Sequence, residues 1–201
     1  KTTSNNYQNR STKTTDSNYN QNKKYTLERF RDLKAAKARV YKNNYQLAVD
    51  AFFAEDWNKA ISYLNIVINS KPDADAYFMR AYSKTRTSDF SGAINDYFNA
   101  IELRPNYVFA YNNLASVKFN NFNVIDSSID YLKTALSYDS NAPMLYLNLA
   151  IIQNAKGSFT LAVKNATRAI VLNVEDKAGA YQSRGEAKRN LKQYQEAIDD
   201  L

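Results

Sequence analysis

The chain of 201 residues contains no cysteine and no histidine. Without cysteine it has neither a disulfide framework nor a thiolate nucleophile, and without histidine it lacks the commonest general base and the usual zinc and iron ligands. Its four glycines are scattered, so they form neither a phosphate-binding loop nor a dinucleotide fingerprint. We therefore expect no catalytic residues, no metal site and no cofactor, and we interpret the chain as a non-enzyme.

Long apolar runs are also lacking, and the positive charge is unevenly distributed. No apolar run approaches the roughly 18 residues of a membrane span, so we expect no transmembrane segment in this sequence. The formal net charge is +7, yet residues 54–201 hold 16 Lys or Arg and 16 Asp or Glu, whereas residues 1–53 hold 11 and 4. A hydrophobic content of 44% is enough for a buried core. Most of the chain should fold, with the excess positive charge at its N-terminal end.

Residues 1–24 contain no aliphatic side chain. Such a segment cannot bury enough apolar area to offset the entropy of ordering, so it is predicted to be a disordered, polar, basic tail. It is either an inert linker or a tether that orders on a partner. A polar tether before a folded array suits a bacterial envelope protein on the periplasmic side, and the same arrangement suits a cytoplasmic assembly factor.

Residues 25–41 are predicted to form a leading amphipathic helix. Leu27, Phe30, Leu33, Ala36 and Val40 recur at steps of three and four, without glycine or proline, which is typical of a helix with one apolar face. The cationic side chains of this segment lie mainly off that face. They form either a solvated surface or a contact with an acidic partner or a membrane surface.

From residue 41 onward the sequence repeats itself. A small residue recurs in the second half of each unit at intervals of 33, 35, 34 and 35 residues, at Ala60, Ala93, Ser128, Ala162 and Ala197. A second small residue recurs earlier in each unit, at Ala48, Ala81, Ala115, Ala150 and Gly185. An aromatic residue precedes the second half at Trp57, Phe90, Phe159 and Tyr194, and in the third unit we assign Phe122 or Val124 to this place. Pro72 and Pro105 close the first two units, where proline ends a helix.

This pattern resembles the tetratricopeptide repeat family, whose units are pairs of antiparallel helices. Small residues let the two helices approach closely, and a hairpin cannot bury its apolar face alone, so units stack. The resemblance implies an all-α fold, a right-handed α-α superhelix of helical hairpins. Its units are expected at about 41–73, 74–107, 108–142, 143–177 and 178–201, the last one truncated. The alternative is another class of two-helix repeat.

In the family that this chain resembles, fixed positions of each first helix face a concave groove that holds a partner. Transferred to this sequence, these positions include Asp75 and Met144, and eleven of them are our candidate groove residues: Tyr45, Val49, Phe52, Phe53, Phe78, Tyr82, Phe109, Asn112, Phe119, Leu147 and Ile151. Of these, Phe78 and Leu147 are expected to be partly exposed. The basic residues of the family's carboxylate clamp are absent, because Tyr45, Val49 and Tyr82 stand in their place. The groove is therefore expected to hold an apolar or aromatic segment of a protein or peptide.

The sequence thus predicts a protein-protein interaction scaffold within a larger protein or assembly, with self-association through the terminal repeat as a further expectation. The alternative is binding of nucleic acid or an acidic partner through the basic N-terminal segment. That segment is rich in Asn and Thr rather than Arg, and the neutral repeats provide no basic stripe, which argues against nucleic acid.

Overall fold

The structure, a computed structural model, describes residues 8–200, and it describes residues 8–27 and Phe30 through their backbone only. Ten α-helices and no strand occur in this range. Their bounds are α1 Gln8–Phe53, α2 Trp57–Ser70, α3 Ala74–Arg86, α4 Phe90–Leu103, α5 Val108–Phe122, α6 Ile125–Tyr138, α7 Pro143–Ala155, α8 Phe159–Val171, α9 Lys177–Asn190 and α10 Tyr194–Ile198.

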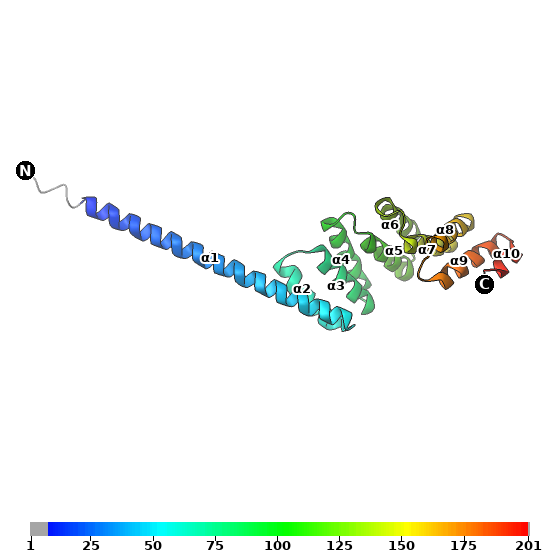
Figure 1. Cartoon of the computed structure of the whole chain (residues 1–201), viewed down its shortest axis with the longest axis horizontal. Coiled ribbons are helices and arrows are strands. Elements are labelled where there is room, and N and C mark those ends of the chain that lie inside the picture. The colour runs from blue at the N-terminus through cyan, green and yellow to red at the C-terminus, as the bar shows by residue number, and fades with distance from the viewer. Residues whose placement is uncertain (1–7, 201) are drawn as a thin grey trace, which may run out of the picture.

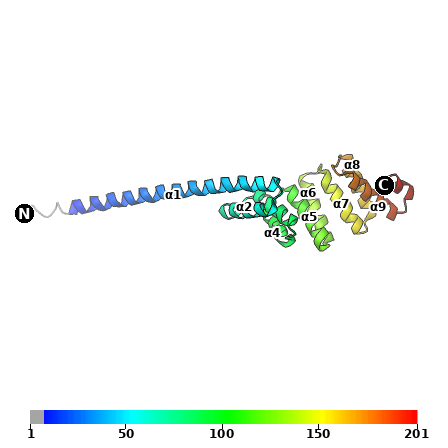
Figure 2. The ribbon, with the colours of Figure 1, turned by 90° about the horizontal axis from the view of Figure 1, so that it is seen from below.

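The helices pack in consecutive hairpins, each formed by an odd-numbered first helix and the even-numbered second helix that follows it. Each hairpin also packs on the next, and the first helices α1, α3, α5, α7 and α9 contact one another in order along the array. Figures 1 and 2 show the resulting elongated array, with α1 at one end and α10 at the other. The predicted fold class, an all-α right-handed superhelix of helical hairpins, is confirmed.

Helix α1 differs from the sequence prediction at its N-terminal end. One helix runs without a break from Gln8 to Phe53. Residues 8–24, which were predicted to be disordered, are therefore helical and continuous with the leading helix and the first repeat. Residues 1–7 of the predicted tail lie outside the described part. The physical reason is that this range has no glycine or proline. Asn, Ser and Thr cost only a few tenths of a kcal/mol each in a helix, and the packed end supplies the nucleus.

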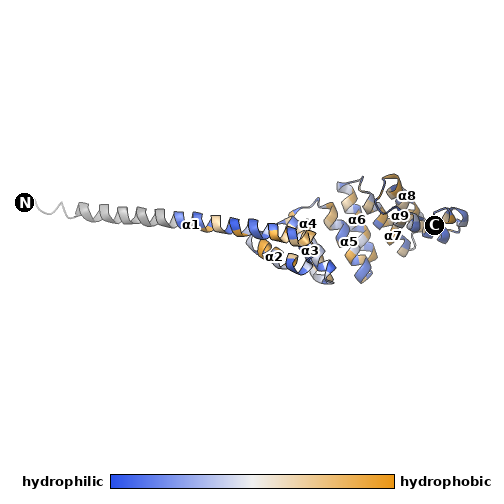
Figure 3. Cartoon of the chain, turned by 60° about the horizontal axis from the view of Figure 1, so that its bottom comes forward, coloured by the Kyte–Doolittle hydropathy of each residue, from blue (hydrophilic) through white to orange (hydrophobic). Residues whose placement is uncertain are grey.

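The N-terminal part of α1 projects away from the hairpins and does not fold back over them (Figures 1 and 2). All side chains of residues 31–40 are exposed, among them Leu33 and Val40 of the predicted apolar face. Figure 3 shows this segment as mainly hydrophilic, whereas hydrophobic residues gather where the helices of the array meet. Within the described residues, no helix is long and apolar enough to cross a membrane.

Acidic residues and prolines set the helix ends. Asp56, Asp73, Asp89 and Asp176 each precede a helix and accept a hydrogen bond from a backbone N–H of its first turn, which satisfies donors that have no partner within the helix. Helices α2 and α4 end two residues before Pro72 and Pro105, respectively. These local signals fix the joints between units before any long-range packing is considered.

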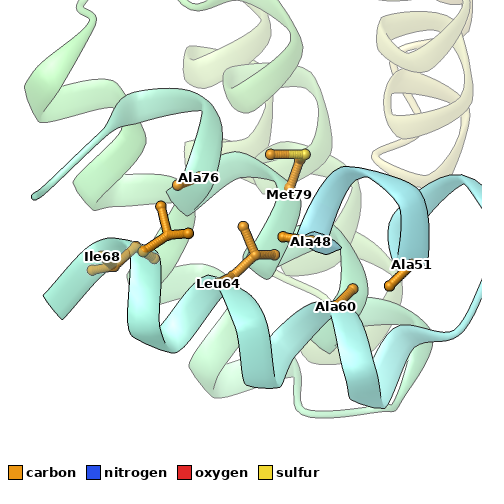
Figure 4. Close-up of a cluster of buried hydrophobic side chains, with 8 residues drawn as sticks. Ala48, Ala51, Ala60, Leu64, Ile68, Ala76 and Met79 are labelled. Carbon is orange, nitrogen blue, oxygen red and sulfur yellow. The ribbon is translucent and has the colours of Figure 1, made fainter. Parts of the chain in front are cut away.

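The core consists of the small residues on which the repeat was recognised, together with the large apolar residues around them. Every one of the ten repeated small positions is buried. Figure 4 shows the first such cluster, where Ala48 and Ala51 of α1 face Ala60 and Leu64 of α2. Because alanine leaves room for close approach, leucine, isoleucine and methionine side chains from α2 and α3 fill the remaining space.

The third hairpin requires a correction. Phe122 and Val124, the residues assigned to open its second helix, are both exposed. Ile125 is instead the first residue of α6 and packs against the core, three residues before Ser128. The same spacing of three separates Trp57 from Ala60 and Phe90 from Ala93. The prediction was wrong because it gave preference to an aromatic residue, whereas the third unit has the aliphatic side chain of Ile125 at this place.

Candidate partner-binding groove

The eleven candidate groove residues lie on the first helices α1, α3, α5 and α7, which adjoin one another along one side of the array. Three of them are well exposed, with Phe53 at 80%, Phe109 at 56% and Ile151 at 40% of their surface accessible. Six are partly buried: Tyr45, Val49, Phe52, Phe78, Tyr82 and Phe119. The structure therefore places most of the predicted residues on a surface that solvent reaches.

Two candidates are buried, and the expectation of partial exposure is wrong for one of them, Leu147. Leu147 is 7% exposed and Asn112 is 8% exposed. Leu147 packs into the core of the fourth and fifth units beside Ala169 and Ala180, and the amide oxygen of Asn112 accepts a hydrogen bond from Asn148 Nδ2 at 2.7 Å. Both side chains hold neighbouring first helices together, so their direct contribution to partner binding is limited.

An aromatic cluster covers the first-helix side of the array where the first hairpin meets the second. The ring of Phe52 lies 5.4 Å from that of Tyr82 and 5.6 Å from that of Trp57, with ring centroids as the reference points. Phe53 meets Phe52 edge to face, and the Arg86 guanidinium lies over Trp57. Such contacts stabilise the cluster beyond area burial alone. They leave Phe53 projecting into solvent.

Asp75 is another residue expected to face the groove. Its carboxylate already accepts hydrogen bonds from residues of the turn before α5. Arg104 donates to both of its carboxylate oxygens, at 2.8 and 2.6 Å, and Tyr107 Oη donates at 2.8 Å. The Arg104 guanidinium lowers the pKa of Asp75, while burial raises the pKa of Tyr107. The ring of Tyr107 stacks on Phe78 at 5.0 Å. This network ties the turn before α5 back to α3 and leaves Asp75 little capacity to bind a partner.

Further along the array, a hollow of about 500 Å³ opens between α5, α7 and the turn before α9. Phe109, Met144, Leu147 and Val174 supply its apolar lining, and Asp139, Glu175 and Asp176 supply carboxylates. A volume of this size is within the range of protein ligand sites. Two candidate residues predicted from the sequence, Phe109 and Leu147, thus contribute to one concave site. The turn residues of this site were not predicted, because their place depends on how successive hairpins stack.

A second set of residues, missed by the sequence analysis, links the two helices of the hairpin in four of the five units. In the second unit, Asp96 is 2% exposed and accepts from Arg80 Nε and Nη2 at 2.8 and 2.6 Å, with Lys84 Nζ at 2.8 Å. In the fifth unit, Arg184 and Lys188 pair with Asp200 in the same register, and Arg184 lowers the pKa of Asp200. The shared spacing of four and then twelve residues was visible in the sequence. These pairs lie between helices and hold the fold.

The third and fourth units make this contact between their two helices with other residue types. In the fourth unit Asn165 Nδ2 donates to Gln153 Oε1 at 2.7 Å. In the third unit the Lys118 ammonium lies 5.8 Å from the ring centroid of Tyr131. One polar position per hairpin is therefore satisfied in four different units by an ion pair, an amide pair or a cation-π contact. Among the described residues, no group of three or more His, Cys, Asp or Glu side chains is arranged to hold a metal ion.

Comparisons with known proteins agree with this architecture. Residues 45–108 match the sequence model of the tetratricopeptide repeat. No match is found among curated protein sequences. Among solved structures, MamA (residues 41 to the end) from Desulfovibrio magneticus RS-1 is similar with a TM-score of 0.72 and 16% identity, covering 82% of this chain and 90% of that chain.

Two further structures share the fold. TTC0263, a thermophilic TPR protein from Thermus thermophilus, gives a TM-score of 0.62 at 16% identity and covers 80% of this chain and 87% of that chain. A chain of the APC/C hetero-tetramer Cut9-Hcn1 gives 0.65 at 21% identity, covering 82% of this chain and 35% of that chain. At these identities the similarity concerns the fold. Residues 45–108 thus carry the tetratricopeptide repeat that the sequence predicted. The array as a whole shares the fold of these helical-hairpin solenoids.

Proposed function

We propose that this protein is a non-catalytic protein-protein interaction scaffold that holds a segment of a partner protein along its first helices. The observation that carries the proposal is the exposure of large apolar side chains on these helices, foremost Phe53 and Phe109. Phe109 lies at the hollow between α5 and α7, next to Met144. Exposed aromatic side chains beside a preformed hollow are typical of interface anchors.

The fold supports the same proposal. A stacked array presents a long surface whose shape is fixed by contacts between neighbouring units, so a partner segment can bind without first ordering the scaffold. One structurally similar chain is part of a hetero-tetramer, an assembly of several proteins.

The alternative is binding of an acidic partner through α1. Its specific support is that residues 31–40 are all exposed and include the cationic side chains Arg31, Lys34, Lys37 and Arg39. Acidic Asp32 lies among them. This alternative is separable from the groove, because the segment projects away from the hairpins (Figure 2).

Affinity capture with matched variants tests the proposal. Phe109→Ala combined with Ile151→Ala truncates exposed side chains of two first helices, whereas Leu161→Ala combined with Val171→Ala truncates exposed side chains of the second helix α8. We expect the first pair to lose the proteins that the wild type retains, and the second pair to keep them, with both melting temperatures close to wild type. Loss of a central aromatic anchor weakens binding by about 2 kcal/mol or more.

Two results would count against the groove. Equal retention by both variant pairs would show that the first helices do not hold the partner. Loss of the retained proteins on deletion of residues 1–40 alone would transfer the binding site to α1.

A further inference from the structure

The hollow between α5, α7 and the turn before α9 carries an unbalanced negative charge. Asp139 lies in the turn between α6 and α7, and Glu175 and Asp176 lie in the turn between α8 and α9. No Lys or Arg nitrogen of the described residues lies within ion-pair distance of these three carboxylates. Lys177 follows Asp176 in the sequence but does not line the hollow. Three unpaired carboxylates therefore border one apolar concavity.

These carboxylates keep acceptor capacity for a ligand. Asp139 uses one oxygen to accept from Asn141 N at 2.9 Å, and Asp176 uses one to accept from Gly179 N at 2.8 Å. Each retains its second oxygen, and no hydrogen bond to the Glu175 side chain occurs among the described residues. The carboxylate of Asp75 in the first turn of α3 is different, since Arg104 from the turn before α5 neutralises it. The negative charge is thus a local property of this hollow in an otherwise neutral array.

The remaining lining is mostly apolar and comes from two successive units. Phe109 is in the first turn of α5, Met144 and Leu147 are on α7, and Val174 precedes α9. Phe109 is 56% exposed, so a bound side chain would remove much of its surface from water. A hollow of about 500 Å³ can accept one large apolar side chain and the groups that flank it.

From this juxtaposition we propose that the hollow binds a cationic amphipathic segment of a partner protein, which inserts one large apolar side chain against Phe109 and directs Lys or Arg side chains to Asp139, Glu175 and Asp176. The inference rests on the proposed scaffold function and specifies its partner. An acidic segment, a nucleic acid or a phosphorylated peptide would bring negative charge to the three carboxylates and is disfavoured by like-charge repulsion at close range.

The test uses the full chain and two fluorescein-labelled peptides of 14 residues, one built from Leu and Lys around a single Phe, and one with Glu replacing every Lys. Fluorescence anisotropy measures their binding at low and at physiological salt. We expect the cationic peptide to bind at least about tenfold more tightly than the acidic peptide, with an affinity that falls as salt rises.

Variants with matched controls assign that binding to the hollow. Asp139→Asn with Glu175→Gln removes two charges, while Asp176 is left in place because it caps α9. Its control is Glu102→Gln with Asp130→Asn, two exposed carboxylates outside the hollow. We expect about tenfold weaker binding of the cationic peptide for the first pair, equivalent to two exposed ion pairs, and no change for the control. Phe109→Ala should also weaken binding about tenfold or more, unlike Phe122→Ala at the other end of α5.

The outcomes separate this inference from the scaffold proposal. If Phe109→Ala weakens both peptides equally while the charge variants have no effect, the groove is supported and the cationic partner is rejected. If no variant changes binding, both proposals fail at this hollow. Sedimentation of the unlabelled chain adds a third outcome: a wild-type dimer that dissociates in Asp139→Asn, Glu175→Gln would identify a second copy as the occupant and overturn the separate partner.

Discussion

At the scale of single residues, the turn inside each hairpin contains one residue in the left-handed region of the backbone. These residues are Glu55, Ser88, Asn123, Gly157 and Lys192, with φ between 52° and 79°. They recur with the period of the units, although only one is glycine. Their side chains carry no common chemistry, so the repeat pattern did not reveal this backbone requirement. The stacking of the two helices imposes it.

Gly157 allows the energetic cost of this conformation to be measured. Its φ is 79°, and a Cβ atom added there would meet no atom within 4 Å, so Gly157→Ala changes the backbone preference without a steric clash. We expect the free energy of unfolding to fall by about 1 kcal/mol, measured by urea denaturation. The reciprocal change, Ser88→Gly, should leave stability equal or slightly increased. A neutral Gly157→Ala would mean that the turn relaxes to another conformation.

At the scale of helices and hairpins, different residue types make the same polar contact between the two helices of a unit. Arg80, Lys84 and Asp96 of the second unit correspond to Leu149, Gln153 and Asn165 of the fourth, by a constant offset along the repeat. The fourth unit thus makes this contact with one amide pair where the second unit uses three charges. A buried ion pair contributes little net stability compared with well-packed neutral side chains. A buried charge that has lost its partner, however, is strongly destabilising.

Two variants of the second unit test this interpretation. Asp96→Ala leaves Arg80 and Lys84 without their shared carboxylate, and we expect a loss of about 3 kcal/mol in the free energy of unfolding. The triple variant Arg80→Leu, Lys84→Gln, Asp96→Asn copies the fourth unit, and it should unfold within about 1 kcal/mol of the wild type. Both are measured by urea denaturation of the full chain. If the triple variant is as unstable as Asp96→Ala, the polar contacts of the two units are not equivalent.

At the scale of the whole molecule, the sequence predicted what depends on local periodicity and missed what depends on stacking. Repeated small residues such as Ala93 and Ala162 are buried as their register requires, since each packs within its own hairpin. The hollow at Phe109 needs Val174 from a later unit, and the neutralisation of Asp75 needs Arg104 from the following turn. Neither contact follows from the residues that repeat in the sequence. The helical state of residues 8–24 was missed because composition was given more weight than continuity with a packed helix.

The projecting part of α1 gives the last prediction. An array in which each unit is stabilised by its neighbours should depend little on a segment whose side chains are exposed. All side chains of residues 31–40 are exposed, while Ala48 and Ala51 are buried against α2 and α3. We therefore expect deletion of residues 1–40 to shift the melting temperature by no more than about 2 °C, since less than 1 kcal/mol of packing is lost, and to reduce helical ellipticity by the share of the removed segment. Circular dichroism measures both quantities in one experiment. Deletion of residues 1–55 is the matched comparison, because it also removes the packed end of α1 and exposes Leu64 and Val67 of α2, each of which contributes about 1.5–3 kcal/mol of burial. A large drop in melting temperature for the shorter deletion would mean that the projecting segment stabilises the array through contacts with another copy of the chain.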